Sequence, residues 1–148
     1  MDGWKPILMS GLHNVFTYAR DALMARKHHK RGDPRFIMLL FTIIESDAYQ
    51  ACSSRARDVY VGLLLNYNGH NNGYIGYGVR AAAKFANCSK NTAAVALKRL
   101  EEVGLIKCMK LSIFATKKIA REWAITHKPV DKHAPTNEWR HFKNNSQS

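Results

Sequence analysis

Residues 78–106 read GVRAAAKFANCSKNTAAVALKRLEEVGLI, and this stretch predicts more of the fold than any other part of the chain. Its beginning has the apolar spacing of a short helix over about 79–85. Its second half has the spacing of a longer amphipathic helix over 90–103. Gly104 is expected to end that helix, since glycine readily adopts the left-handed conformation of a C-terminal cap.

The two helices are expected to pack closely through small side chains. Ser89 follows a tight turn at 87–88 and is expected to cap the second helix, because its hydroxyl can accept a hydrogen bond from a backbone N–H of the first turn. Two helices joined by so short a turn are typical of a helix-turn-helix, whose second helix can lie in a DNA major groove. The residues expected to face inward are Ala82, Ala83, Ala86, Ala93, Ala96, Leu97, Leu100 and Val103.

The outward face of the second helix carries side chains that can read DNA. Asparagine can bridge an adenine edge, lysine can donate to guanine or phosphate, and alanine or valine can touch a thymine methyl group. Arg80 and Lys84 lie four residues apart on the first helix, where they would share one face and hold phosphates. The DNA contacts predicted in this pair of helices are Arg80, Lys84, Ser89, Lys90, Asn91, Thr92, Ala94, Val95 and Lys98.

A basic strand–loop–strand follows directly, as a wing would. Residues 105–110 and 121–127 alternate as two strands, with Trp123 and Ile125 inward, and residues 111–118 would form the tip between them. We therefore expect a mainly α fold with a small β-hairpin, of the α+β class, in the form of a winged helix-turn-helix. The wing lysines expected to contact phosphates are Lys110, Lys117 and Lys118.

The positive charge of the chain is concentrated in the same region. The formal net charge is +12, and residues 78–118 carry nine Lys or Arg against two Asp or Glu. Residues 36–77, in contrast, carry two basic and three acidic side chains. A concentrated basic block indicates a surface that faces a polyanion, and double-stranded DNA is the partner that fits the helices.

Length and composition fit one folded domain with extensions. The chain has 148 residues, of which 46% are hydrophobic, and no run of 18 apolar residues that would predict a membrane-spanning helix. The N-terminus lacks the pattern of a secretory signal. Three cysteines without CxxC spacing are typical of free thiols in a reducing compartment, so we expect a cytoplasmic protein. The expected binding to DNA would make it nucleoid-associated.

Composition shifts divide the chain into three parts. Residues 1–35 are expected to form an N-terminal extension, a helix followed by a basic linker, that packs on the domain or pairs with a second subunit. Residues 36–127 form the predicted domain, which begins with an apolar run over 36–44 that suits a buried strand or a short core helix. A helix over about 55–67 is expected to follow. Residues 128–148 form a polar tail that we expect to be partly disordered, although Trp139 and Phe142 suggest that it folds back on the domain.

The second helix and its exit resemble the recognition helix and following strand of winged-helix regulators of the GntR and MarR kind. A longer stretch, about 36–142, resembles uncharacterised helix-turn-helix proteins of alphaproteobacterial genomes, plasmids and phages. The resemblance implies a winged-helix DNA-binding fold. This chain departs from the GntR pattern at Ala94 and Val95, where arginine is frequent. The matching motifs are S-x-x-A-R at 53–57, Y-N-G-x-N-N-G at 67–73, V-R-x-A-A at 79–83, C-S-x-x-T-A at 88–93, L-E-E-x-G-x-I at 100–106 and E-W-x-L-T, with Ile for Leu, at 122–126.

Other chemistries are not favoured. The seven histidines include no HExxH and no Cys/His quartet, so we expect no metal site. No nucleophile–base pair, glycine-rich phosphate loop or paired carboxylates are evident, so we expect neither an enzyme nor a cofactor.

The sequence therefore predicts a sequence-specific double-stranded DNA-binding protein. We expect it to act as a transcriptional regulator and repressor, as a homodimer, with no membrane partner. Two alternatives stay open: a plasmid or phage replication-initiation factor, and a winged-helix module that binds another protein. The target sequence and any effector ligand are not indicated by the residues.

Overall fold

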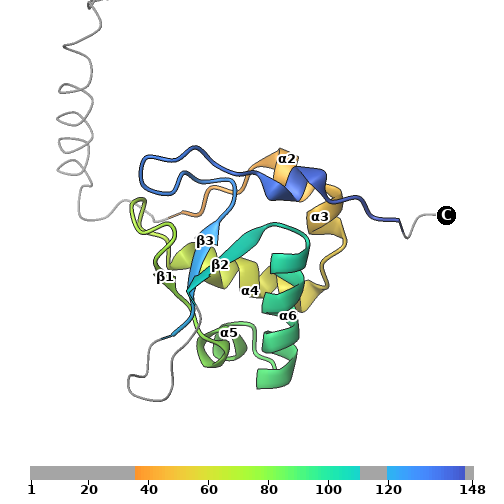
Figure 1. The fold of residues 1–148 in the computed structure, drawn as a ribbon. Helices are drawn as coiled ribbons and strands as arrows, with labels where there is room; N and C mark the ends of the chain where they lie inside the picture. The colour runs from red at the N-terminus through yellow and green to blue at the C-terminus, as the bar shows by residue number, and fades with distance from the viewer. Residues whose placement is uncertain (1–35, 111–119, 146–148) are drawn as a thin grey trace, which may run out of the picture. The chain divides into compact units, whose positions relative to one another are not determined.

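The fold consists of a small sheet and a group of short helices (Figure 1). The structure, a computed structural model, describes residues 36–110 and 120–145. In chain order its elements are α2 (Phe41–Ile44), α3 (Asp47–Gln50), α4 (Ser54–Leu65), β1 (Ile75–Gly76), α5 (Val79–Phe85), α6 (Lys90–Glu102), β2 (Ile106–Lys110), β3 (Glu122–Ile125) and the 3₁₀ helix η2 (Glu138–His141). The strands form an antiparallel sheet in the order β1-β3-β2. The α+β class predicted from the sequence is confirmed.

Helix α4 lies at the centre of the helical layer and contacts both α5 and α6. It begins one residue before the predicted start, because the Ser53 hydroxyl accepts a hydrogen bond from the Ala56 N–H at 3.2 Å, and it ends two residues before the predicted end. Val59, Tyr60 and Leu63 on its inner face are fully buried. The apolar face of α4 is thus the base on which the next two helices pack.

Helices α5 and α6 have the boundaries expected from their spacing, to within one residue. The turn between them closes with Asn87 at φ 48°, a left-handed conformation that asparagine tolerates better than most residues. Ser89 then caps α6 by accepting a hydrogen bond from the Thr92 N–H at 3.1 Å. All eight residues expected to face inward on the two helices are buried. Their many alanines allow the helices to approach closely.

The end of α6 depends on Gly104. Gly104 has φ 79°, and the Leu105 N–H donates to the Leu100 carbonyl at 3.0 Å, as in a Schellman cap. A Cβ atom at this position would lie 2.7 Å from the carbonyl carbon of Glu138 and 2.8 Å from the Trp139 nitrogen. Both the backbone conformation and the close approach of η2 therefore require glycine.

The sheet closes the opposite side of the core. Ile75 pairs with Trp123, and Ile106 pairs with Ile125, and all four side chains are fully buried. The Trp123 indole N–H donates to the Tyr77 carbonyl at 2.8 Å, which satisfies its polar atom inside the core. The inward orientation predicted for Trp123 and Ile125 is confirmed.

Asn72 joins the loop before β1 to the segment after β3. Its side-chain oxygen accepts from the Ile125 N–H at 2.6 Å, and its Nδ2 atom lies 2.9, 3.0 and 3.1 Å from the carbonyl oxygens of Ile125, Lys128 and Pro129. The side chain is 1% exposed. No local sequence pattern marks Asn72 as a buried anchor, so it was missed.

The apolar run 36–44 is less buried than expected. Residues 36–40 have no regular structure, and the short helix α2 buries only Ile43 fully. Phe36, Met38 and Phe41 are exposed. Of the two alternatives expected here, the short helix is present as α2, although it buries little. The buried strand is wrong, because residues 36–40 pair with no strand of the sheet and alternate residues among them are exposed.

The tail folds back on the domain, as its aromatic residues predicted. Trp139 is buried, and Phe142 lies under the Arg99 guanidinium at 5.4 Å. The Lys107 ammonium lies 2.8 Å from the Glu138 carboxylate and joins β2 to η2. Figure 1 shows this segment beside α2 and α3.

Two sets of predictions lie outside the described residues: the N-terminal extension over 1–35 and the hairpin tip over 111–118. Within the part of the chain that the structure describes, no helix is long and apolar enough to span a membrane.

Candidate nucleic-acid interface

Helix α6 has one buried face and one exposed face. The buried face packs on α4 and α5 through residues that include Ala93, Leu97 and Leu100. Every residue predicted to contact DNA from this helix is exposed. These residues are Lys90, Asn91, Thr92, Ala94, Val95 and Lys98.

Ser89 has a structural task at the start of this face. Its hydroxyl oxygen accepts from the Thr92 N–H and lies 2.9 Å from the Thr92 hydroxyl. The predicted contact of Ser89 with DNA must therefore coexist with its capping role. The side chains of Lys90 and Asn91 take no part in this cap, and neither forms a hydrogen bond with another described residue.

Arg80 and Lys84 flank the same region on α5. Both side chains are exposed and four residues apart, so they lie on one face of the helix, as predicted. Neither forms an ion pair with a carboxylate of the described residues. Their charges are therefore available to an external anion.

Of the three lysines predicted to contact phosphates from the wing, the structure describes one. Lys110 is exposed at the end of β2, where the chain leaves the sheet. Lys117 and Lys118 lie outside the described residues. The structure thus brings together the predicted residues of α5 and α6 and does not describe residues 111–119.

The distribution of acidic residues makes the N-terminal part of α6 positive. The sequence has no Asp or Glu between Asp58 and Glu101. Glu102 lies 3.9 Å from Lys98 and 3.5 Å from Arg99, and Glu101 accepts from the Cys108 N–H at 3.1 Å. The two carboxylates are therefore held at the C-terminal end of the helix. An anion that approaches the first turns of α6 meets basic and neutral groups.

Arg55 is a further basic residue of this region, and no sequence pattern predicted it as a contact. Its guanidinium donates to the Ala86 carbonyl at 2.8 Å, in the turn before α6, and lies 3.7 Å from the Asp58 carboxylate. The side chain is about half exposed. Since Arg55 and Ala86 are 31 residues apart, only the packing of α4 on α5 reveals this neighbour.

A groove runs beside the exposed face of α6. The turn between α3 and α4, with Ala51 and Ser53, forms one wall, and α6 forms the other. The groove has a volume of about 700 Å³ and is open to solvent. The residues that line it from α6 are Asn91, Thr92, Val95, Ala96, Lys98, Arg99 and Glu102. Three of the predicted contacts, at positions 91, 95 and 98, therefore lie on one face of α6 and line the same groove.

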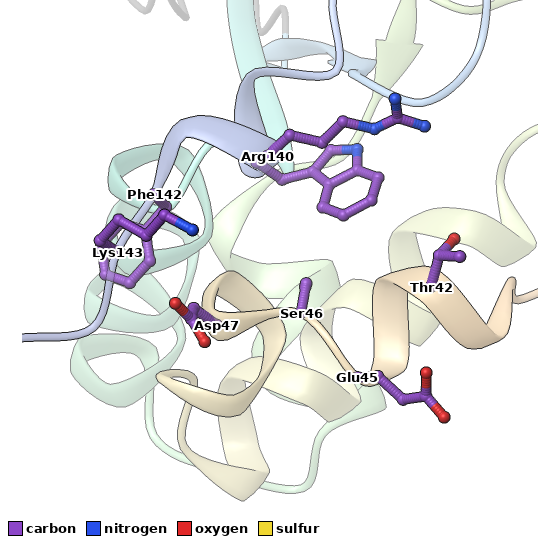
Figure 2. A pocket seen from close by; sticks show the side chains of 8 residues that line it. Thr42, Glu45, Ser46, Asp47, Arg140, Phe142 and Lys143 are labelled. Atoms are coloured by element: carbon purple, nitrogen blue, oxygen red, sulfur yellow. The ribbon is translucent and has the colours of Figure 1, made fainter. Parts of the chain in front are cut away.

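A second hollow, of about 440 Å³, lies where the tail meets the α2–α3 segment (Figure 2). Glu45 and Asp47 line it from the helical segment, and Arg140 and Lys143 line it from the tail. Its two acidic and two basic side chains balance, so this hollow does not favour a polyanion, whereas the groove beside α6 has two basic side chains against one acidic side chain. The groove beside α6 is the better match to the charge of the chain.

The strongly perturbed titratable groups lie in the core. Burial lowers the pKa of His127 to about 4, with a further contribution from the neighbouring charge of Lys128. Burial also raises the pKa of Tyr60 above its usual range and that of Tyr77 to about 12. None of these three groups lines the groove beside α6.

Within residues 36–110 and 120–145, no three His, Cys, Asp or Glu side chains gather as a metal site would require.

No family model, curated protein or solved structure matches the chain.

Proposed function

We propose that this chain is a winged helix-turn-helix protein that binds double-stranded DNA by sequence and regulates transcription as a repressor. The observation that carries the proposal is the outer face of α6. This face is exposed, has no acidic residue in its first three turns, and presents lysine and asparagine side chains beside an open groove. A packing role alone does not account for that combination, because the opposite face already fills the core.

In this proposal α6 lies in the major groove, which is wide enough to admit a helix. Lys90, Asn91 and Lys98 then reach base edges or nearby phosphates. Arg80 and Lys84 on α5 hold a flanking backbone, where contacts fix the register of the protein on DNA. The α5–α6 pair acts as the helix-turn-helix.

In this proposal the antiparallel strands β2 and β3 form the wing. The two strands follow α6 directly, and the lysine at the end of β2 leads into a segment whose sequence contains Lys117 and Lys118. We propose that these lysines contact phosphates beside the major groove. Such contacts raise affinity for all DNA sequences and do not select among them.

We also propose that the protein acts as a homodimer in the cytoplasm, on the nucleoid. The exposed apolar side chains Met38, Leu40 and Phe41 support this, with exposed fractions of 57%, 42% and 82%. A second copy would remove them from water. Sedimentation equilibrium of the full-length chain should give twice the mass of the monomer, and Phe41→Ser should shift the equilibrium toward the monomer. A monomer at all concentrations would exclude the dimer.

The salt dependence of DNA binding tests the function. If about six phosphates are contacted, affinity for a duplex should fall by about 10³-fold between roughly 50 and 200 mM salt. Enriching duplexes from a random library with the full-length chain, followed by titration at several salt concentrations, measures this slope. A module that binds only another protein would show no enrichment of any duplex and no steep salt dependence of DNA binding.

A further inference from the structure

Val95 is an exposed apolar side chain on the outer face of α6. It is 68% exposed, and in α6, whose residues are all described, it is the one large hydrophobic side chain on the outer face. A β-branched residue is also a slightly poor choice for an exposed helix position, because the helix restricts its side-chain rotamers. Neither core packing nor helix stability accounts for Val95.

Asn91 lies one turn before Val95 on the same face of the helix. Residues four apart on a helix have Cβ atoms about 6 Å apart, so one extended surface can contact both side chains. Both line the groove opposite Ala51 and Ser53. None of the hydrogen bonds among the described residues uses the Asn91 side chain, so its donor and its acceptor are both free.

We propose that Val95 and Asn91 together read neighbouring A·T base pairs, with Val95 on a thymine methyl group and the Asn91 amide on an adenine edge. This inference rests on the DNA-binding function proposed above. In the major groove, thymine alone among the four bases carries a C5 methyl group, and adenine offers the acceptor N7 beside the donor N6. A side-chain amide matches that donor–acceptor pair, and an isopropyl group matches the methyl.

The neighbouring groups fit this assignment. Lys98, three residues after Val95, has a side chain that is 78% exposed and can reach a phosphate at the edge of the groove. The helix carries no arginine between Lys90 and Lys98, so the bidentate arginine contact that most often selects guanine is missing at its outer face. The readout therefore favours A·T over G·C pairs at the centre of the contact.

Removing the methyl group from the DNA tests the assignment without changing the protein. Duplexes enriched from a random library by the full-length chain are resynthesised with deoxyuridine in place of each thymidine in turn. At one thymidine or more, the substitution should weaken binding by about fourfold, the weight of one buried methyl group. The Val95→Ala variant should bind thymine and uracil duplexes within about twofold of each other.

A matched control uses another exposed apolar residue. Leu65 lies at the end of α4 and is 47% exposed, and the Leu65→Ala variant should keep the full preference for thymine. Asn91→Ala should lose discrimination against 7-deazaadenine, which lacks the N7 acceptor. Because Val95 and Asn91 are exposed, both variants are expected to fold, and circular dichroism checks this.

The outcomes distinguish a failure of the proposed A·T readout from a failure of the proposed DNA binding. Enriched duplexes without A·T pairs, or an equal response of wild type and Val95→Ala to deoxyuridine, would overturn the readout and leave DNA binding in place. Failure to enrich any duplex, with no salt-dependent binding, would instead overturn the proposed function.

Discussion

The phenol hydroxyl of Tyr60 and the Nδ1 atom of His127 lie 3.1 Å apart in the core, where they join helix α4 to the residues that follow strand β3. The other ring nitrogen of His127, Nε2, is buried and has no hydrogen-bond partner among the described residues. A proton on this ring would place a charge in the core, where no carboxylate of the described residues forms an ion pair with it. The contact therefore ties the stability of the fold to pH.

Stability should fall on acidification because of His127. Burial lowers the pKa of His127 in the folded state to about 4, below the ordinary value of 6.5. The contribution of neutral His127 to the free energy of unfolding is complete above pH 6.5 and is lost as pH falls toward 4. Urea unfolding at about pH 7.5 and 5 should differ by roughly 2 kcal/mol for this residue. His127→Gln should reduce that difference, and His133→Gln, which changes an exposed histidine, should not.

Gly104→Ala should destabilise the protein by about 2 kcal/mol or more. The new methyl group would clash with the backbone of Glu138 and Trp139, and φ 79° is unfavourable for alanine. Gly76→Ala is the matched control, because a Cβ there has no neighbour within 4 Å. Thermal unfolding compares the two variants, and equal melting temperatures would contradict the packing of η2 on the end of α6.

Asn72→Ala should cost about 3 kcal/mol of unfolding free energy. The change leaves the Ile125 N–H and the carbonyls around it without their buried partner. Asn71→Ala should cost less, since the hydrogen bonds of Asn71 are exposed to water. If the two variants unfold at the same urea concentration, Asn72 does not anchor the sheet as described.

Arg80→Ala and Lys84→Ala should each weaken DNA binding about equally on all duplexes and should reduce the salt slope by about 1. The reason is that a phosphate contact carries no sequence information. Lys132→Ala, in the turn between Val130 and His133, serves as the control for a change of net charge. An unchanged slope in both α5 variants would exclude α5 from the interface.

Local signals allowed most of the α5–α6 region to be predicted. A serine cap, apolar spacing and a terminal glycine each act within a few residues, so the sequence marks both boundaries of α6. Contacts between distant residues could not be read in the same way. Asn72 bonds to residue 125, and Arg55 bonds to residue 86, and neither pairing leaves a local pattern.

The same distinction between local and long-range features applies to the candidate site. Periodicity alone identifies the outward positions of α6, because the inward positions are apolar. The wall of the groove at Ala51 and Ser53 depends on how α3 and α4 pack beside α6, which composition does not reveal. The exposure of the run 36–41 was missed for a related reason: an apolar segment is buried only where a partner element covers it.

The central claim is that the outer face of α6 binds DNA, and backbone amide chemical shifts measure it most directly. The chain has a mass of 16.8 kDa, which suits solution NMR of a ¹⁵N-labelled sample. On titration with an enriched duplex, the largest shifts are expected at residues 80–84 and 89–98, with small shifts at residues 130–141. Shifts confined to residues outside α5, the turn and α6, or no shifts with any duplex at low salt, would contradict the account.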